Sequence, residues 1–77
     1  MVVFQNQVRF AELTLTPVTP GNAAAMRTLA LELLHFSPEA RVVRKLVEAC
    51  ETLGLQQEAE AYRARFRVAF PDEPNPP

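Results

Sequence analysis

The sequence contains one histidine, His35, and one cysteine, Cys50. A thiol nucleophile needs a positioned base, and a metal site needs several ligands at suitable spacing. Glu32, three residues before His35, permits only a surface hydrogen bond. Cys50 falls on an apolar stripe, where buried and unreactive thiols are usual. We therefore expect no catalytic residue, no metal site and no cofactor-binding site, and we predict that the chain itself is not an enzyme.

Basic side chains in the second half of the chain are candidates for a binding role. They occur at Arg41, Arg44, Lys45, Arg63, Arg65 and Arg67. Gathered on one surface, they could contact a phosphate-bearing lipid, a nucleic acid or an acidic partner. The alternative is an ordinary solvated surface, because acidic residues are interspersed and the net charge is −1. This balance favours the solvated surface and argues against nucleic acid.

Surplus apolar residues are a second candidate surface. Leu31 and Leu34 lie off the main stripe of their expected helix, and Val2, Val3 and Phe4 begin the chain. Such residues either fill the core or meet a partner. We predict a protein partner or self-association, with no nucleic acid and no metal. The predicted interface comprises Phe4, Leu31, Leu34, Arg41, Arg44, Lys45, Arg63 and Arg67.

Two helices are expected in the first half of the chain. Phe4, Val8, Ala11 and Leu15 follow a helical period and predict a helix over 3–15. Residues 11–16 also alternate as a strand would, but no second strand is available for pairing. The loop 16–22 contains two prolines and a glycine, and either Thr19 or Asn22 can cap a second helix over 22–36. That helix has one stripe at Met26, Leu29, Ala30, Leu33 and Phe36 or Ser37.

A helical hairpin is expected from Ser37 to Pro71. Ser37-Pro38-Glu39 is a helix start signal, and Gly54 is a helix end signal. A fourth helix should run from about residue 56 to 69 and stop at Pro71. The third helix has its stripe at Val43, Leu46, Val47, Cys50 and Leu53, and the fourth at Ala59, Tyr62, Phe66 and Ala69 or Phe70. We predict one all-α domain over 1–71 and a disordered proline-rich tail over 72–77.

A shift of 33 positions superposes the two halves of the chain without a gap. The paired positions are Leu13 with Leu46, Gly21 with Gly54, Leu29 with Tyr62, Leu33 with Phe66, and Pro38 with Pro71. Two units of this length indicate a helical repeat. The second unit resembles a tetratricopeptide repeat at Val43, Leu46, Gly54, Ala59 and Pro71. It departs from that pattern at Val47, Cys50, Arg63 and Phe66.

A second resemblance covers residues 4 to 71. The run FQNQVRFAELTLTPVTPGNAAAM, then LHFSPEARVV and a closing AFP, resembles the C-terminal region of bacterial O-antigen polymerase/ligase proteins and protein O-oligosaccharyltransferases. In that family such a segment follows the last membrane helices and ends in tetratricopeptide-like helices. The resemblance implies the soluble part of an inner-membrane glycan enzyme. The reactive residues of that family lie in membrane-proximal loops that have no counterpart in these residues.

Together these features predict four helices in two antiparallel hairpins, tetratricopeptide-like. The expected function is a non-catalytic protein-interaction module at the C-terminus of a membrane glycan polymerase or ligase. The alternative is a small helix-turn-helix DNA-binding regulator, with Arg41, Arg44 and Lys45 leading the reading helix. The sequence pI of about 5.7 argues against that alternative.

Overall fold

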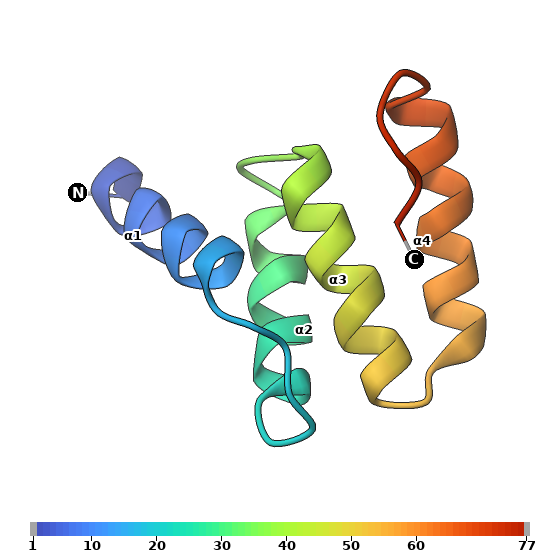
Figure 1. Cartoon of the computed structure of the whole chain (residues 1–77). Coiled ribbons are helices and arrows are strands. Elements are labelled where there is room, and N and C mark those ends of the chain that lie inside the picture. Colours follow the sequence, from blue (N-terminus) through green and yellow to red (C-terminus); the bar gives the residue numbers. More distant parts are fainter. Residues whose placement is uncertain (1, 77) are drawn as a thin grey trace.

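The computed structural model describes the backbone of residues 2–76 and the side chains of residues 7–76. Four helices follow one another: α1 (Val2–Leu15), α2 (Ala23–Leu33), α3 (Ala40–Thr52) and α4 (Gln56–Ala69). No strand occurs within residues 2–76, so the all-α prediction is confirmed. Figure 1 shows α2, α3 and α4 side by side, each reversing direction, with α1 oblique beside α2. The choice of helix over strand for the first segment is therefore also confirmed.

Helix α3 is the centre of the domain. It contacts each of the other three helices, and α2 lies between α1 and α3 in Figure 1. Its apolar residues Val42, Leu46, Val47, Ala49 and Cys50 are fully buried. Charged residues take the opposite side of the helix, as a surface helix with a single apolar face requires. This arrangement positions Arg41, Arg44 and Lys45 together on the outer side of α3.

The predicted apolar stripe of α1 is wrong. Val8 is 51% exposed and Leu15 is 81% exposed, whereas Leu13 is fully buried and Phe10 packs against the core. The expected stripe placed Leu15 inside and omitted Leu13. A short helix with apolar residues on two sides satisfies more than one stripe, and contacts with α2 and α3 decide which side is buried.

The boundaries around Pro38 also differ from the prediction. Helix α2 ends at Leu33 rather than at residue 36, and Phe36 is 59% exposed. Residues 34–36 form turns instead, closed by a bond from the Ser37 amide to the Leu33 carbonyl of 2.7 Å. Helix α3 begins at Ala40 with Glu39 as the extended N-cap residue, so Ser37 does not cap it.

Other helix stripes need smaller corrections. Val42 and Ala49 of α3 are buried although they lie off the predicted stripe, while Leu53 is 38% exposed. Ala69, predicted as a possible stripe residue of α4, is exposed. The buried side chains of α2 and α4 include Met26, Ala30 and Leu33, and Ala59 and Phe66, all of them predicted stripe residues.

Thr19 and Asn22 close the loop before α2 together. The Asn22 side chain accepts from the Thr19 amide at 2.7 Å and donates to the Pro17 carbonyl at 3.0 Å. The Thr19 hydroxyl accepts from the Asn22 amide at 3.2 Å. Asn22 is the N-cap residue by position, but its side chain makes no capping hydrogen bond. Its side chain therefore fixes the loop rather than the helix end.

Gly54 ends α3 in a left-handed conformation, with φ of 77°. The Leu55 amide donates to the Cys50 carbonyl at 2.8 Å, and the Gly54 amide donates to the Glu51 carbonyl at 3.0 Å. This pair of bonds is the Schellman motif, which satisfies the last carbonyls of a helix. The predicted helix end at Gly54 is confirmed.

Replacing Gly54 with alanine should lower the free energy of unfolding by about 1 kcal/mol, because an L side chain disfavours positive φ. A Cβ at this position would meet no atom within 4 Å, so strain of the backbone is the sole expected cost. Thermal or urea unfolding measures the change. Gly21→Ala is the control, because φ of Gly21 is not positive. An equal loss in both variants would contradict the prediction.

The 33-residue correspondence extends to the helices. Ala23, the first residue of α2, and Gln56, the first residue of α4, are 33 positions apart. The paired residues Leu13 and Leu46 are both fully buried, as are Leu33 and Phe66. These two pairs of positions therefore have the same burial in each half, whereas the paired glycines differ, because only Gly54 has a positive φ.

Residues 71–76, which we call the tail, turn back at the end of α4 and run down beside it in Figure 1. The Glu73 amide donates to the Phe70 carbonyl at 3.1 Å. Glu73 and Pro74 both contact Arg44, and Pro76 is buried. The predicted division into a domain over 1–71 and a disordered segment over 72–77 stays a prediction.

Candidate interaction surface

Three basic residues, Arg41, Arg44 and Lys45, lie on the outer side of α3 and define what we call the α3 basic face. The helical spacing of positions 41, 44 and 45 places them on one side of the helix. All three line a hollow of about 220 Å³ together with Thr14 and Glu48. The structure thus gathers half of the predicted basic residues into one place.

Aromatic rings hold the two arginines of this face. The Arg41 guanidinium lies 5.1 Å from the centre of the Phe10 ring of α1, and that of Arg44 lies 5.1 Å from the centre of the Phe66 ring of α4. Both distances are within the range of cation–π attraction. The two arginines are thereby fixed toward opposite neighbours of α3. Planar guanidinium groups held in this way present their N–H groups to an acceptor at lower entropic cost.

Lys45 has a different partner. Its ammonium group donates to the Thr16 backbone carbonyl at 2.8 Å. That carbonyl follows the end of α1, so the contact joins α3 to the loop between α1 and α2. Lys45 contributes positive charge to the α3 basic face while stabilising the loop.

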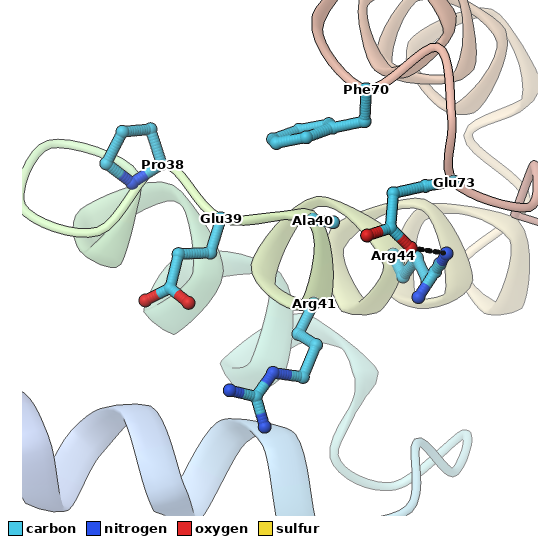
Figure 2. A pocket seen from close by; sticks show the side chains of 7 residues that line it. All are labelled: Pro38, Glu39, Ala40, Arg41, Arg44, Phe70 and Glu73. Atoms are coloured by element: carbon cyan, nitrogen blue, oxygen red, sulfur yellow. Dashed lines mark hydrogen bonds and ion pairs between the residues drawn. The ribbon is translucent and has the colours of Figure 1, made fainter.

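A larger hollow of about 570 Å³ lies at the start of α3, between that helix and the tail. Figure 2 shows Phe70 and Glu73 on one side of α3 and Arg41 pointing to the other side, toward α1. Arg44 donates from Nη2 to a Glu73 carboxylate oxygen at 3.2 Å and to the Pro74 carbonyl at 2.9 Å. The hollow combines arginine N–H donors with an aromatic ring, which suits recognition of a polar chain with apolar side groups.

The three remaining predicted basic residues have partners on other sides, and the guanidinium of Arg65 lies over the Tyr62 ring of its own helix, 5.8 Å from the ring centre. Arg63 of α4 forms ion pairs with Glu51 and Glu60, and Arg67 lies 3.8 Å from Glu60. These residues bind carboxylates of α3 and α4 rather than adding to the hollows at the α3 basic face. The role of Arg63 and Arg67 in an interface stays a prediction.

The predicted apolar interface residues lie in different places. Leu31 and Leu34 are partly buried and pack against the core. Leu34 also lines an apolar hollow of about 180 Å³ with Tyr62, Phe66 and Phe70. The side chain of Phe4 lies outside the described residues. Leu31 and Leu34 therefore serve the core at least in part, and their role in an interface stays a prediction.

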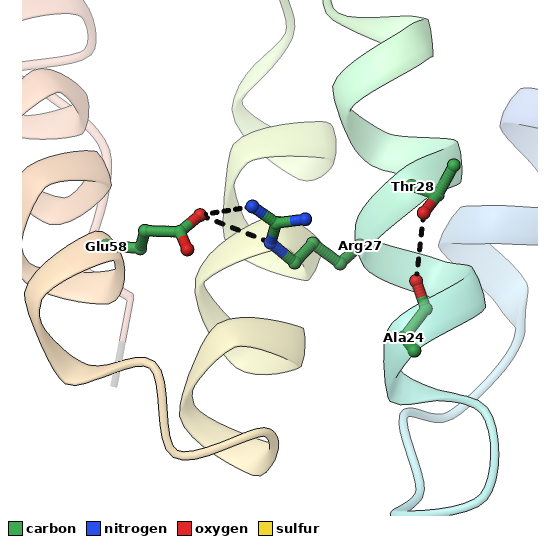
Figure 3. Close-up of polar contacts among 4 residues, drawn as sticks. All are labelled: Ala24, Arg27, Thr28 and Glu58. Carbon is green, nitrogen blue, oxygen red and sulfur yellow. Dashed lines mark hydrogen bonds and ion pairs between the residues drawn. The ribbon is translucent and has the colours of Figure 1, made fainter.

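Cys50 is fully buried where α2, α3 and α4 meet. Figure 3 shows Arg27 of α2 reaching Glu58 of α4, with its Nε and Nη2 donating to one carboxylate oxygen at 3.2 and 2.6 Å. Burial raises the pKa of the Cys50 thiol, the Glu58 carboxylate raises it further, and Arg27 acts in the opposite direction. The hydrogen bond that Arg27 donates to Glu58 also raises the pKa of Arg27. A thiol of raised pKa remains protonated at neutral pH and is a poor nucleophile.

Cys50 should react with a disulfide reagent such as dithionitrobenzoate only as fast as the domain opens, because the thiol is both buried and protonated. The measurement is the rate of thiolate release at pH 7, with the chain in urea as the reference for full exposure. A matched control places a cysteine at Val68, which is 85% exposed, in a Cys50→Ala background. Equal rates in the native wild type and the control would contradict the prediction.

His35 lies exposed in the turn after α2. Glu32, its predicted neighbour, pairs instead with Arg9 of α1. Among the described residues no group of three or more His, Cys, Asp or Glu side chains is placed to hold a metal ion. His35 is exposed in a turn whereas Cys50 is fully buried in α3, so these two residues do not form a common site.

A family model described as "virulence factor membrane-bound polymerase, C-terminal" matches residues 1–76. The chain belongs to this family. The resemblance to the C-terminal region of O-antigen polymerase/ligase proteins is thereby confirmed. Within the described residues, no helix of this polymerase C-terminal domain has the length and apolar character needed to cross a membrane. No curated protein and no solved structure gives a significant match to the chain.

The sequence alone did not indicate several residues of this surface. Phe10, Phe70 and Glu73 complete the surroundings of the two arginines. Phe70 was expected only as a helix-stripe residue, and Glu73 only as part of the tail. Arg44 lies on α3 and Glu73 follows the end of α4, 29 positions later, so no local spacing in the sequence indicates their contact.

Proposed function

We propose that this polymerase C-terminal domain is a non-catalytic, tetratricopeptide-like interaction module on a membrane-embedded glycan polymerase or ligase. Its role is to support assembly or recruitment by binding a protein partner or a second copy. The α3 basic face is the observation that carries the proposal. It combines cationic groups held by aromatic rings with adjacent hollows. The two residue types suited to nucleophilic or base chemistry are buried or isolated from each other.

Deletion of this domain from its parent enzyme tests the proposal. In purified parent enzyme, deletion should change the turnover number by no more than about twofold, because no transition-state contact is removed. In cells, formation of the glycan product should fall, because the enzyme no longer meets its partner. A turnover loss of about 100-fold or more in the purified enzyme would contradict the proposal, since losses of that size indicate a catalytic group.

A triple variant of the α3 basic face sharpens this experiment. Replacing Arg41, Arg44 and Lys45 with glutamine in the parent enzyme should reproduce the cellular loss while leaving the domain in place. The matched control replaces Arg63, Arg65 and Arg67 of α4, which removes the same charge from the neighbouring helix. Equal cellular losses in both variants would mean that the α3 basic face has no role distinct from the arginines of α4, and would remove it as the observation that carries the proposal.

Nothing in the contacts favours the DNA-binding alternative. Two of the three bases assigned to its reading helix are engaged within the domain, since Arg44 contacts Glu73 and Pro74, and Lys45 contacts Thr16. The charge balance of −1 adds no attraction for a phosphate backbone. A salt-titrated binding assay with duplex DNA is expected to detect no affinity at low salt.

A further inference from the structure

The contacts of the tail show what kind of chain the α3 basic face accepts. One guanidinium, that of Arg44, binds a carboxylate of Glu73 and the next backbone carbonyl, that of Pro74. Pro76, two residues further along, is buried. A carboxylate, a backbone carbonyl and a buried proline in sequence are features of a polypeptide, here one that leaves the turn at residues 70–73 and continues without regular secondary structure. Proline suits such a segment because it lacks an N–H that would need a partner.

The charges at the face permit exchange of this segment. Arg41, Arg44 and Lys45 line the two hollows together with the carboxylates of Glu39 and Glu48. With Glu73 in place these charges balance, and without it one positive charge is left over. The Arg44–Glu73 pair is itself partly exposed, with 32% and 49% of the two side chains accessible. Pairs of this exposure are weak, so a competing carboxylate can replace Glu73.

We propose that the α3 basic face binds an acidic, proline-containing segment of a partner protein, and that the tail occupies this site until the partner displaces it. The inference rests on the proposed function and specifies its partner chemistry. The partner segment supplies a carboxylate and the following backbone carbonyl to Arg44. It also supplies an apolar group to the hollow beside Phe70. An acidic polypeptide fits this set better than a phosphate, because a phosphate offers neither the carbonyl nor the apolar group.

The test uses the full chain and a fluorescent peptide with the sequence of residues 70–76, FPDEPNP, as the probe. The tethered tail competes at a high effective concentration, so the wild type should bind the probe weakly. Glu73→Gln should tighten binding by about two- to fivefold, because the tail loses one partly exposed ion pair. Arg44→Gln should weaken binding, and Glu73→Gln should have no further effect in that background. Arg65→Gln, with the same charge change on α4, is the matched control.

Three results would overturn the inference: equal affinity of wild type and Glu73→Gln, full affinity in Arg44→Gln, or an equal loss in Arg65→Gln. The chain could instead bind anionic lipid vesicles or inorganic phosphate, lose that binding in Arg44→Gln, and not bind the peptide. This result would show that the ligand of the α3 basic face is a phosphate group and not a polypeptide. Circular dichroism confirms that each variant is folded. The Glu73→Gln arm remains decisive if Arg44→Gln unfolds, because Glu73 is half exposed and outside the core.

Failure here is distinguishable from failure of the proposed function. If domain deletion impairs glycan formation in cells while substitution of Arg44 or Glu73 leaves the affinity for the peptide unchanged, the partner binds elsewhere on the domain. In that case the proposed role as an interaction module stands. If deletion of the domain has no effect in cells, the module role fails regardless of the affinity for the peptide.

Discussion

Phe66→Ala is expected to lower the free energy of unfolding by about 3–5 kcal/mol. Phe66 is the largest fully buried side chain among the described residues. Its ring packs against Phe70, with 5.2 Å between ring centres, and lies beneath the Arg44 guanidinium. Truncation removes both contacts and leaves a cavity between α3 and α4 that the backbone cannot fill. A chain of 77 residues has a free energy of unfolding of about 4–12 kcal/mol. This one substitution therefore removes a large fraction of that free energy.

Phe36→Ala is the matched control for this variant. The same atoms are removed, but Phe36 is 59% exposed in the turn between α2 and α3. Its loss should cost less than about 1 kcal/mol, the usual range for exposed sites. Urea unfolding followed by circular dichroism gives both values. Comparable losses in the two variants would show that the hairpin of α3 and α4 is not packed around Phe66.

Helix positions were largely predictable because local signals marked their ends. Gly54 has the positive φ that a helix end favours, and Pro71 follows the end of α4 by two residues. The start of α3 was misplaced by a similar signal. Ser37 and Pro38 suited a helix start, but bonds from the Ser37 amide to Leu33 and from the Glu39 amide to Ser37 close turns there instead. Competition between two local patterns is decided by tertiary packing, which a single sequence does not display.

The candidate surface was less predictable than the helices. Spacing placed Arg41, Arg44 and Lys45 on one side of α3, and the structure does so. Spacing gave no means of separating them from Arg63 and Arg67, which pair with Glu51 and Glu60. Nor could it show that Glu73 returns to Arg44, a contact across 29 positions. Such contacts depend on the direction in which the chain leaves α4, and the prolines of the tail constrain that direction without specifying it.

The packing of α1 provides the second large effect. Leu13→Ala should lower the free energy of unfolding by about 2–5 kcal/mol, as full burial of a leucine implies. Leu13 is the fully buried side chain of α1 among the described residues, and it belongs to the main core cluster. The other described contacts of α1 are less buried: Phe10 is partly buried against the core and lies below Arg41, and Arg9 pairs with Glu32. Loss of Leu13 should therefore loosen α1 first and the remaining helices afterwards.

Leu15→Ala is the control that makes this result diagnostic. It removes the same atoms from the same helix, but Leu15 is 81% exposed, so a change of less than about 0.5 kcal/mol is expected. The apolar stripe read from the sequence makes the opposite prediction, with Leu15 inside and Leu13 outside. Urea unfolding gives the stability of each variant, and amide hydrogen exchange of residues 7–15 reports whether α1 opens separately. A larger loss of stability in Leu15→Ala than in Leu13→Ala would mean that α1 buries the face predicted from the sequence. Phe10 could then no longer lie beneath Arg41 at the α3 basic face.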